Sequence, residues 1–279
     1  MTARSIDLNA DLGESYGAYR YGADEAMMPL ITSANIACGF HAGDPLAIQA
    51  AVRLAHEHGV RIGAHVGLPD PLGFGRREMN ISAADAYAYT LYQIGALDGF
   101  LRRDRIPMTH VKPHGALYMM AADNAVLAEG IARAVADFNP DLALYALPHS
   151  ALAEAGEAYR LSVVNEFFAD RPYDGTKVTM FDWTDDQLGS PADAADRVAK
   201  MLSNLQFDTV ETICVHSDTR DAPLIMVEVR HRLIDDGHEV GCSAGDAFPP
   251  GRTEAELAYP KMTLPCPATK SAVADAASG

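Results

Sequence analysis

Short apolar runs alternate along this chain with longer stretches whose apolar residues recur at helical spacing. The runs at 142–146, 161–164 and 212–215 are short and apolar, as expected of strands that lie between helices. A repeated order of strand and helix predicts parallel strands joined by crossover helices. The pattern therefore indicates an α/β fold with one central parallel sheet.

Helix boundaries are the best-marked features of the pattern. Asp44 followed by Pro45 is a typical start, because the aspartate caps the first turn and proline needs no amide donor there. Gly59 ends that helix, and Ser82 with Asp85 forms a capping-box pattern that starts the next. The predicted helices span about 45–58, 82–103, 123–138 and 190–205.

Polar residues gather where strands are predicted to end, most densely in SANIACGFHAGDP at 33–45. A short buried strand there runs into a turn in which His41 lies between Gly39 and Gly43. Packing explains such a histidine poorly, although it can also cap or hydrogen-bond its own loop. Loops after strands carry the ligand chemistry of many α/β proteins. This turn is therefore a candidate part of a site.

Five further segments end in the same way, in glycine, histidine or a carboxylate. One such ending has little meaning alone, but six on successive strands predict a shared rim at one end of the sheet. The residues they supply are Asn9, Asp11, Glu14, Asn35, His41, His65, Asp70, His110, Lys112, His114, Tyr118, Glu166, Asp170, Arg171, His216 and Asp218.

The same segments resemble the LamB/YcsF family, in family order, up to about Asp236. They are DLNADLGESYGAY (7–19), TSANIACGFHAGDP (32–45), GAHVGLPDPLGFGRR (63–77), YQIGAL (92–97), HVKPHGALY (110–118), FADRPY (168–173) and CVHSD (214–218). The resemblance implies a seven-stranded (β/α) barrel like the glycoside hydrolase/deacetylase barrel. It also implies ATP-dependent hydrolysis of 5-oxo-L-proline (pyroglutamate) to L-glutamate, together with 5-oxoprolinase subunits B and C.

Opening such a lactam requires a nucleophile, an activated carbonyl and a proton for the leaving nitrogen. Asp11 and Glu14 lie just past a strand, and at least one is a candidate base for a water; Asp11 alternatively caps the next turn. His41 or His114 is a candidate to donate the proton or polarise the carbonyl. The candidate catalytic residues are thus Asp11, Glu14, His41 and His114.

The chain has 22 lysines and arginines against 38 aspartates and glutamates, so an anionic substrate needs local positive or amide groups to bind. Lys112, stiffened by Pro113, is a candidate anion contact, with a salt bridge to Asp70 or Glu166 as the alternative. The asparagines either bind a substrate carboxylate or carbonyl or fix a loop, and Arg76 is a further positive candidate. The predicted substrate-binding residues are Asn9, Asn35, His65, Lys112, Arg77, Arg171 and Asp218.

The sequence does not identify a cofactor. Asp11, His41, His65 and His114 are ligand types that zinc or manganese prefers, but they come from different strands, so their spacing neither supports nor excludes a metal. The chain has no G-x-x-x-x-G-K-[ST] and no G-x-G-x-x-G. If the complex consumes ATP, the binding determinants lie in partner chains or are not recognisable here.

Composition narrows the choice of partners. A formal net charge of −16 argues against nucleic acid as a partner, and no apolar run is long enough to span a membrane. The four cysteines are scattered without a C-x-x-C pair, which argues against a cysteine zinc cage and favours a reducing cytoplasm. No linker divides the chain, so we expect one barrel domain over 1–242 and an irregular or disordered tail over 243–279. A homo-oligomer is compatible with these features.

The chain departs from the family pattern after Tyr173, where a Ser-Arg pair gives way to DGTKVTMFDWTDD. This altered segment keeps two alternatives open. One is a metal-dependent deacetylase or amidohydrolase acting on another small amide or carbohydrate. The other is a non-catalytic partner subunit that holds the substrate.

Overall fold

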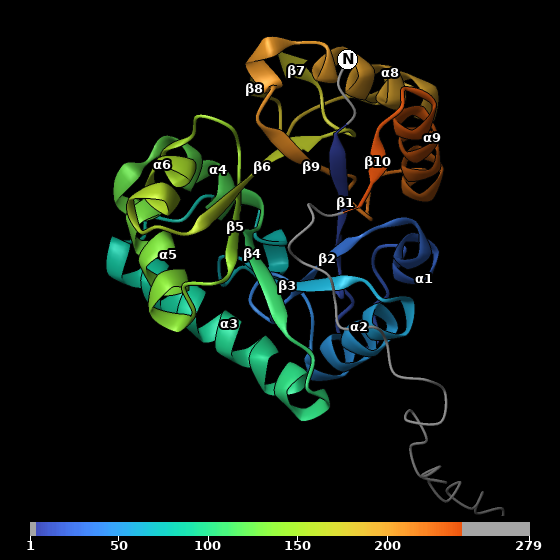
Figure 1. Ribbon diagram of the computed structural model, residues 1–279. Helices are drawn as coiled ribbons and strands as arrows, with labels where there is room; N and C mark the ends of the chain where they lie inside the picture. The colour runs from blue at the N-terminus through green and yellow to red at the C-terminus, as the bar shows by residue number, and fades with distance from the viewer. Residues whose placement is uncertain (1–3, 242–279) are drawn as a thin grey trace, which may run out of the picture. The chain divides into compact units, whose positions relative to one another are not determined.

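A computed structural model describes residues 4–241, and within them seven parallel strands close into a barrel (Figure 1). The last barrel strand pairs with the first, which completes the ring. The seven-stranded (β/α) barrel predicted from the sequence is therefore confirmed, while the predicted tail at 243–279 lies outside the described residues. The barrel strands, in order, are β1 (Ser5–Leu12), β2 (Ser33–Ala37), β3 (Arg61–Val66), β4 (Met108–Pro113), β5 (Ala143–Ala146), β6 (Ser162–Phe168) and β9 (Val210–Cys214).

Helices in the connections surround this ring (Figure 1). The longer ones are α2 (Pro45–His58), α3 (Ala83–Asp104), α4 (Gly115–Asp123), α5 (Ala125–Phe138), α6 (Ala151–Ala158), α8 (Pro191–Leu202) and α9 (Ala222–Asp235). The shorter elements are α1 (Asp24–Met27), α7 (Asp185–Leu188), three 3-10 helices (Met28–Leu30, Pro71–Gly73, Leu205–Phe207), the β7–β8 hairpin (Tyr173–Asp174, Lys177–Val178) and β10 (Glu239–Val240), which pairs with the start of β1.

The four predicted helices are confirmed, with small shifts at their ends. The Asp44 carboxylate accepts from the backbone N–H groups of Leu46 and Ala47, and the Ser82–Asp85 capping box is formed. The helix expected from 123 begins at Ala125 instead, because α4 occupies the residues before it. Helix α4 was not predicted, because it lacks a side-chain N-cap and buries residues on several sides.

The interior of the barrel is polar. Along β1, Asp7, Asn9 and Asp11 alternate with buried apolar residues, and neighbouring side chains of a strand point to opposite faces. The three polar side chains bond to groups on other barrel strands, so they face the lumen. The apolar residues between them therefore face the helices. The hydrophobic core lies between the sheet and the helices, and the lumen is filled by hydrogen-bonded groups.

The narrow lumen leaves no room for a side chain at Gly63 on β3. A Cβ there would lie 2.2 Å from two atoms of the His110 ring on β4. That ring stacks on Tyr145, with ring centroids 4.3 Å apart. The Tyr145 hydroxyl donates to Asp7 at 3.1 Å. Aromatic rings and one buried carboxylate thus close the amino-terminal part of the lumen.

Candidate functional site

Asn9 and Asn35 link the lumen to the predicted rim. The Asn9 side-chain amide donates to Glu166 at 3.0 Å and to Thr212 at 2.8 Å, and its oxygen accepts from Asn35 and Lys112. Asn35 also donates to Asp11 at 2.8 Å. Every hydrogen-bonding position of Asn9 is therefore taken by the protein. Substrate binding by these asparagines stays a prediction, and the contacts observed are those that hold Asp11 in place.

Lys112 is fully buried at the centre of the site. Its Nζ lies 2.9 Å from Asp11 Oδ1, 2.8 Å from Glu166 Oε1 and 3.1 Å from Cys214 Sγ. The salt bridge to Glu166 that the sequence offered as one alternative is confirmed; the one to Asp70 is wrong, because Asp70 pairs with Arg77. Burial lowers the pKa of Lys112, but the Asp11 carboxylate and the other acidic partners outweigh it and raise the pKa well above its usual value.

Asp11 stands between this lysine and two histidines. Its Oδ1 accepts from Asn35 and Lys112, while Oδ2 lies 3.2 Å from His65 Nε2 and 3.6 Å from His216 Nε2. Burial raises the pKa of Asp11, but His65 and Lys112 more than offset it, so the carboxyl is ionised at neutral pH. The alternative that Asp11 caps the following turn is wrong, because Asp24 accepts from the Gly13 N–H there.

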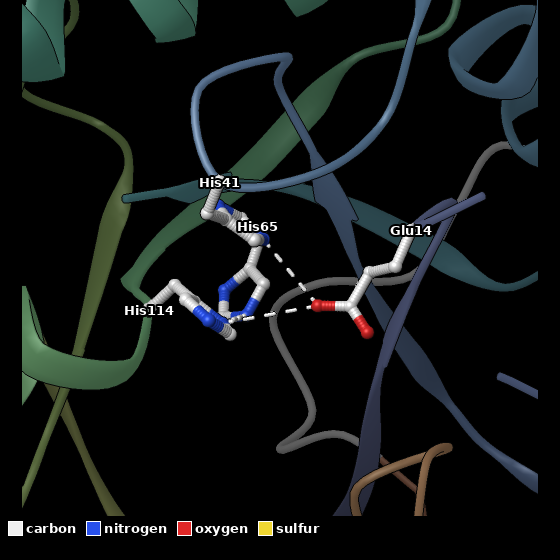
Figure 2. A group of neighbouring side chains, drawn as sticks. All are labelled: Glu14, His41, His65 and His114. Atoms are coloured by element: carbon white, nitrogen blue, oxygen red, sulfur yellow. Dashed lines mark hydrogen bonds and ion pairs between the residues drawn. The ribbon is translucent and has the colours of Figure 1, made fainter. Parts of the chain in front are cut away.

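Glu14, His41, His65 and His114 form a second group beside Asp11, called here the histidine cluster (Figure 2). His41 Nε2 lies 3.3 Å from Glu14 Oε1, and His114 Nδ1 lies 3.8 Å from the same oxygen. The His41 and His114 rings stack at 3.8 Å, and His65 Nε2 is 2.9 Å from His114 Nδ1. Four residues from four loops and strands thus point at one spot.

Two rings of the cluster are oriented by backbone carbonyls. His65 Nδ1 donates to the Lys112 carbonyl at 3.1 Å, and His114 Nε2 donates to the Phe74 carbonyl at 2.7 Å. Burial and the neighbouring histidines lower the pKa of His114 well below its usual value. Burial, followed by the charges of Asp11 and Asp218, raises the pKa of Glu14 well above its usual value. The environment therefore favours the uncharged forms of Glu14 and His114.

Asp170 and His216 form a carboxylate–histidine pair that the sequence analysis placed on the rim without a role. His216 Nδ1 lies 3.0 Å from Asp170 Oδ1, and Asp170 Oδ2 accepts from Arg171 Nη1 and Thr219 Oγ1. Burial raises the pKa of Asp170, but Arg171 and His216 outweigh it, so the carboxyl is ionised. The two residues are 46 positions apart, so nothing in the sequence indicated that they meet. The only signal was that each follows a predicted strand.

Charged residues at the mouth are paired with one another. Arg76 Nη2 lies 2.6 Å from Asp218 Oδ2, which also accepts from the Tyr21 hydroxyl at 2.9 Å. Arg77 pairs with Asp70 instead, and its side chain is 64% exposed. Of these predicted binding residues, Asp218 thus lies beside the site, while the structure brings Arg76 rather than Arg77 to the cavity.

The cavity at this site is small, about 10 Å³, which is room for about one water molecule. Asp11, His65, Lys112, His114, Arg171 and His216 all line it. Met180 and Phe181, from the segment after β8, complete its wall. These two residues belong to the stretch that departs from the family pattern. The altered segment therefore helps to enclose the site.

The protein is a parallel (β/α) barrel with titratable residues at the carboxyl ends of its strands. In barrels of this class, small-molecule sites lie at that end. The chain belongs to the LamB/YcsF family, whose model matches residues 6–246. The family predicted from the sequence motifs is thus confirmed. No helix of the described part is long and apolar enough to cross a membrane.

Two curated relatives are similar over most of their length. The A subunit of 5-oxoprolinase from Symbiobacterium thermophilum is 48% identical over 254 residues, covering 87% of this chain and 97% of the relative. The protein of the same name from Bacillus subtilis is 48% identical over 246 residues, covering 84% and 95%.

Solved structures agree with this fold. The lactam utilization protein from Thermus thermophilus is 42% identical, with a TM-score of 0.78, covering 85% of this chain and 99% of that one. A putative cellobiose-phosphate cleavage protein from Enterococcus faecalis has 14% identity and a TM-score of 0.54, covering 86% and 98%. That second likeness bears on the fold alone.

Proposed function

We propose that this chain hydrolyses the lactam ring of 5-oxo-L-proline to give L-glutamate, acting with 5-oxoprolinase subunits B and C while the complex consumes ATP. The names of the relatives, the A subunit of 5-oxoprolinase and a lactam utilization protein, support the substrate class. The observation that carries the proposal is that Asp11, held ionised, and His216, oriented by Asp170, line one cavity.

Hydrolysis requires water to add to the ring carbonyl carbon and the ring nitrogen to take a proton as its bond to that carbon breaks. Because His216 Nδ1 faces Asp170, its Nε2 is free to accept the proton of the water and then to deliver it to the nitrogen. Asp11, 3.6 Å from that Nε2, orients the water through Oδ2. Glu14, whose protonated form is favoured, and His41 polarise the carbonyl from the other side.

The carboxylate of the substrate needs a positive partner. Arg76 and Arg171 both line the cavity, and the buried Arg171 Nε has no hydrogen-bond partner among the described residues. A guanidinium N–H free in this way suits a carboxylate oxygen. We assign substrate anchoring to Arg171, with Arg76 at the mouth.

ATP enters the proposal through the partners. The chain has no phosphate-binding glycine loop of either common type. One account is that the complex transfers the terminal phosphoryl group of ATP to the lactam oxygen, which makes the ring carbon a better electrophile for the water. Ring opening then leaves an acyl phosphate, and a second water hydrolyses it to L-glutamate and inorganic phosphate. The barrel subunit then performs the hydrolytic half of the reaction.

Glutamate release from 5-oxoproline and ATP tests this function. The assay compares this chain alone, subunits B and C alone, and all three together. We expect activity only in the full mixture. ATP-independent activity of this chain alone contradicts the division of labour. No activity in any mixture, with B and C shown competent beside a relative of established activity, contradicts the substrate.

A second candidate is hydrolysis of another small amide. It is favoured by one observation: Met180 and Phe181, in the segment that departs from the family, form part of the cavity wall. A panel of lactams and N-acyl amides, assayed with the same mixtures, separates this candidate from the first.

A further inference from the structure

We propose that the histidine cluster binds one divalent transition-metal ion through Glu14, His41, His65 and His114. One donor atom from each residue lies within 4.8 Å of all the others. All four side chains are buried, and they converge from separate loops and strands (Figure 2). Three imidazole nitrogens with one carboxylate oxygen form a donor set that suits zinc, cobalt or manganese.

Hydrogen placement is the strongest argument for an ion. The carbonyls of Lys112 and Phe74 cannot donate, so His65 Nδ1 and His114 Nε2 must carry protons. In neutral rings, the lone pairs of His65 Nε2 and His114 Nδ1 then face each other at 2.9 Å. This contact repels unless a cation or an extra proton lies there. Histidines that bind a metal through one ring nitrogen commonly donate a hydrogen bond from the other to a backbone carbonyl, as these two do.

A single extra proton would remove the repulsion between His65 and His114 but would not bridge the other donors of the cluster. His41 Nε2 points at Glu14 Oε1 at 3.3 Å, and its ring stacks on His114 with the planes 4° apart. Charging both stacked rings would place like charges at a ring separation of 3.8 Å. One divalent ion among the four donors meets all of them at once.

The neighbouring group of Asp11, Cys214 and His216 also brings ligand types together. There, however, Lys112 Nζ already lies 2.9 Å from Asp11 and 3.1 Å from Cys214. Within residues 4–241, no lysine or arginine forms an ion pair with Glu14. The Lys112 ammonium thus already supplies the positive charge beside Asp11 and Cys214, and we place the metal ion in the histidine cluster.

The role of the ion rests on the proposed function, whereas its binding does not. An ion at this place would polarise the lactam carbonyl as a Lewis acid. Glu14, His41 and His114 would then act on the carbonyl as ligands of the ion. Proton transfer would stay with His216.

The experiment uses the full-length chain, stripped with a chelator and titrated with Zn²⁺, Co²⁺ or Mn²⁺ in a calorimeter, with bound metal counted by elemental analysis. We expect one ion per chain and a higher melting temperature with metal. Glu14→Gln and His114→Gln should each weaken binding by more than about 100-fold, beyond the loss typical of an outer-shell change. His216→Gln is the matched control and should keep the affinity. Circular dichroism checks that each variant is folded, and His41→Gln replaces any that is not.

Three results overturn the inference. They are no stoichiometric binding of any of the three ions, equal affinity in the cluster variants, or a thiolate charge-transfer band in the cobalt spectrum, which would place the ion at Cys214. Metal binding without glutamate release in the full mixture refutes the proposed function and leaves the ion site standing. Glutamate release by an ion-free complex refutes the catalytic role of the ion, while the binding titration decides on the site itself.

Discussion

Single buried charges hold this site together, and Lys112 shows how much depends on one of them. Its ammonium forms ion pairs with both Asp11 and Glu166, which are buried. Lys112→Met keeps most of the volume but leaves two carboxylates without a counter-charge. We expect the free energy of unfolding to fall by about 3–5 kcal/mol, measured by urea denaturation.

The matched control for that change is Arg53→Met on α2. Arg53 pairs with Glu57 at 3.8 Å on the surface, where its side chain is 74% exposed. Its loss should change stability by at most about 0.5 kcal/mol. If Lys112→Met were equally mild, the buried network would not be the charge balance described here.

His216 is the residue on which the proposed proton transfer depends. His216→Gln should lower kcat of the full mixture by about 10²–10⁴-fold, because the proposed mechanism assigns the proton transfer to this imidazole. Asp170→Asn should also lower kcat and change the pH–rate profile, since the imidazole loses its orienting carboxylate. Steady-state glutamate release measures both. Replacing the exposed His231 with Gln should change neither quantity, and normal kcat in His216→Gln would remove this histidine from the mechanism.

His110 gives the fold a pH dependence that is separate from catalysis. Burial, reinforced by the charge of Arg61, lowers its pKa to about 3. The unfolded chain, with a histidine pKa of about 6.5, then binds more protons than the folded one as the pH falls from about 6.5. Stability should therefore drop toward acid, by up to about 1.4 kcal/mol per pH unit from this residue.

Urea denaturation at pH 7, 6 and 5 measures that slope. His110→Gln can keep the contact to Asn35 but has no proton to gain, so its slope should be shallower than that of the unchanged chain. His231→Gln should keep the original slope. Parallel slopes for the unchanged chain and His110→Gln would show that the buried ring contributes nothing to the acid sensitivity.

At the scale of elements, the contact between β3 and β4 limits what the barrel accepts. Gly63→Ala places a methyl group 2.2 Å from the His110 ring, which is itself stacked on Tyr145. We expect a loss of about 1–3 kcal/mol in thermal or urea unfolding. Gly95→Ala, on the exposed side of α3 with nothing within 4 Å, should instead stabilise by about 0.5–1 kcal/mol. Similar losses at both positions would contradict the tight lumen.

Elements with local signals were predictable from the sequence, and those without them were not. Asp44 and the Ser82–Asp85 pair mark helix starts that the structure confirms. The start of α4 has no such signal, because His114 makes no side-chain cap and its ring turns into the histidine cluster. A residue committed to the site is not available to mark its own helix.

At the scale of the whole molecule, the site is closed around a cavity of about 10 Å³. A lactam is larger than one water, so the wall of the cavity has to move for a substrate to enter, and we expect the segment that carries Met180 and Phe181 to do so. Hydrogen exchange of peptides from 173–189 should slow when 5-oxoproline and the partner subunits are present. Peptides from α8 serve as the control and should not change. Equal exchange in 173–189 with and without substrate would mean that entry follows another route.

Which side chains meet in the site depends on the register and pairing of the barrel strands, which the sequence pattern does not give. Strand ends carrying polar residues were recognisable one by one. That Asp170 faces His216 follows only from the pairing of β6 with β9, which the β7–β8 hairpin and the helices α7 and α8 separate in sequence. That Lys112 meets Cys214 follows from both facing a single lumen. Long-range neighbours of this kind come from topology, and so the charge balance and the proton states were out of reach.

The pairing of β9 with β1 has a consequence for the chain during its synthesis. Asp7 and Thr212 meet across 205 positions of sequence, so β1 leaves the ribosome long before its closing neighbour exists. At about 5–20 residues per second, that wait lasts on the order of 10–40 s. Because one face of β1 carries Asp7, Asn9 and Asp11, the waiting strand shows charge where a wholly apolar one would invite aggregation. We therefore expect the polar residues of the lumen to limit aggregation of the chain while its synthesis is still incomplete.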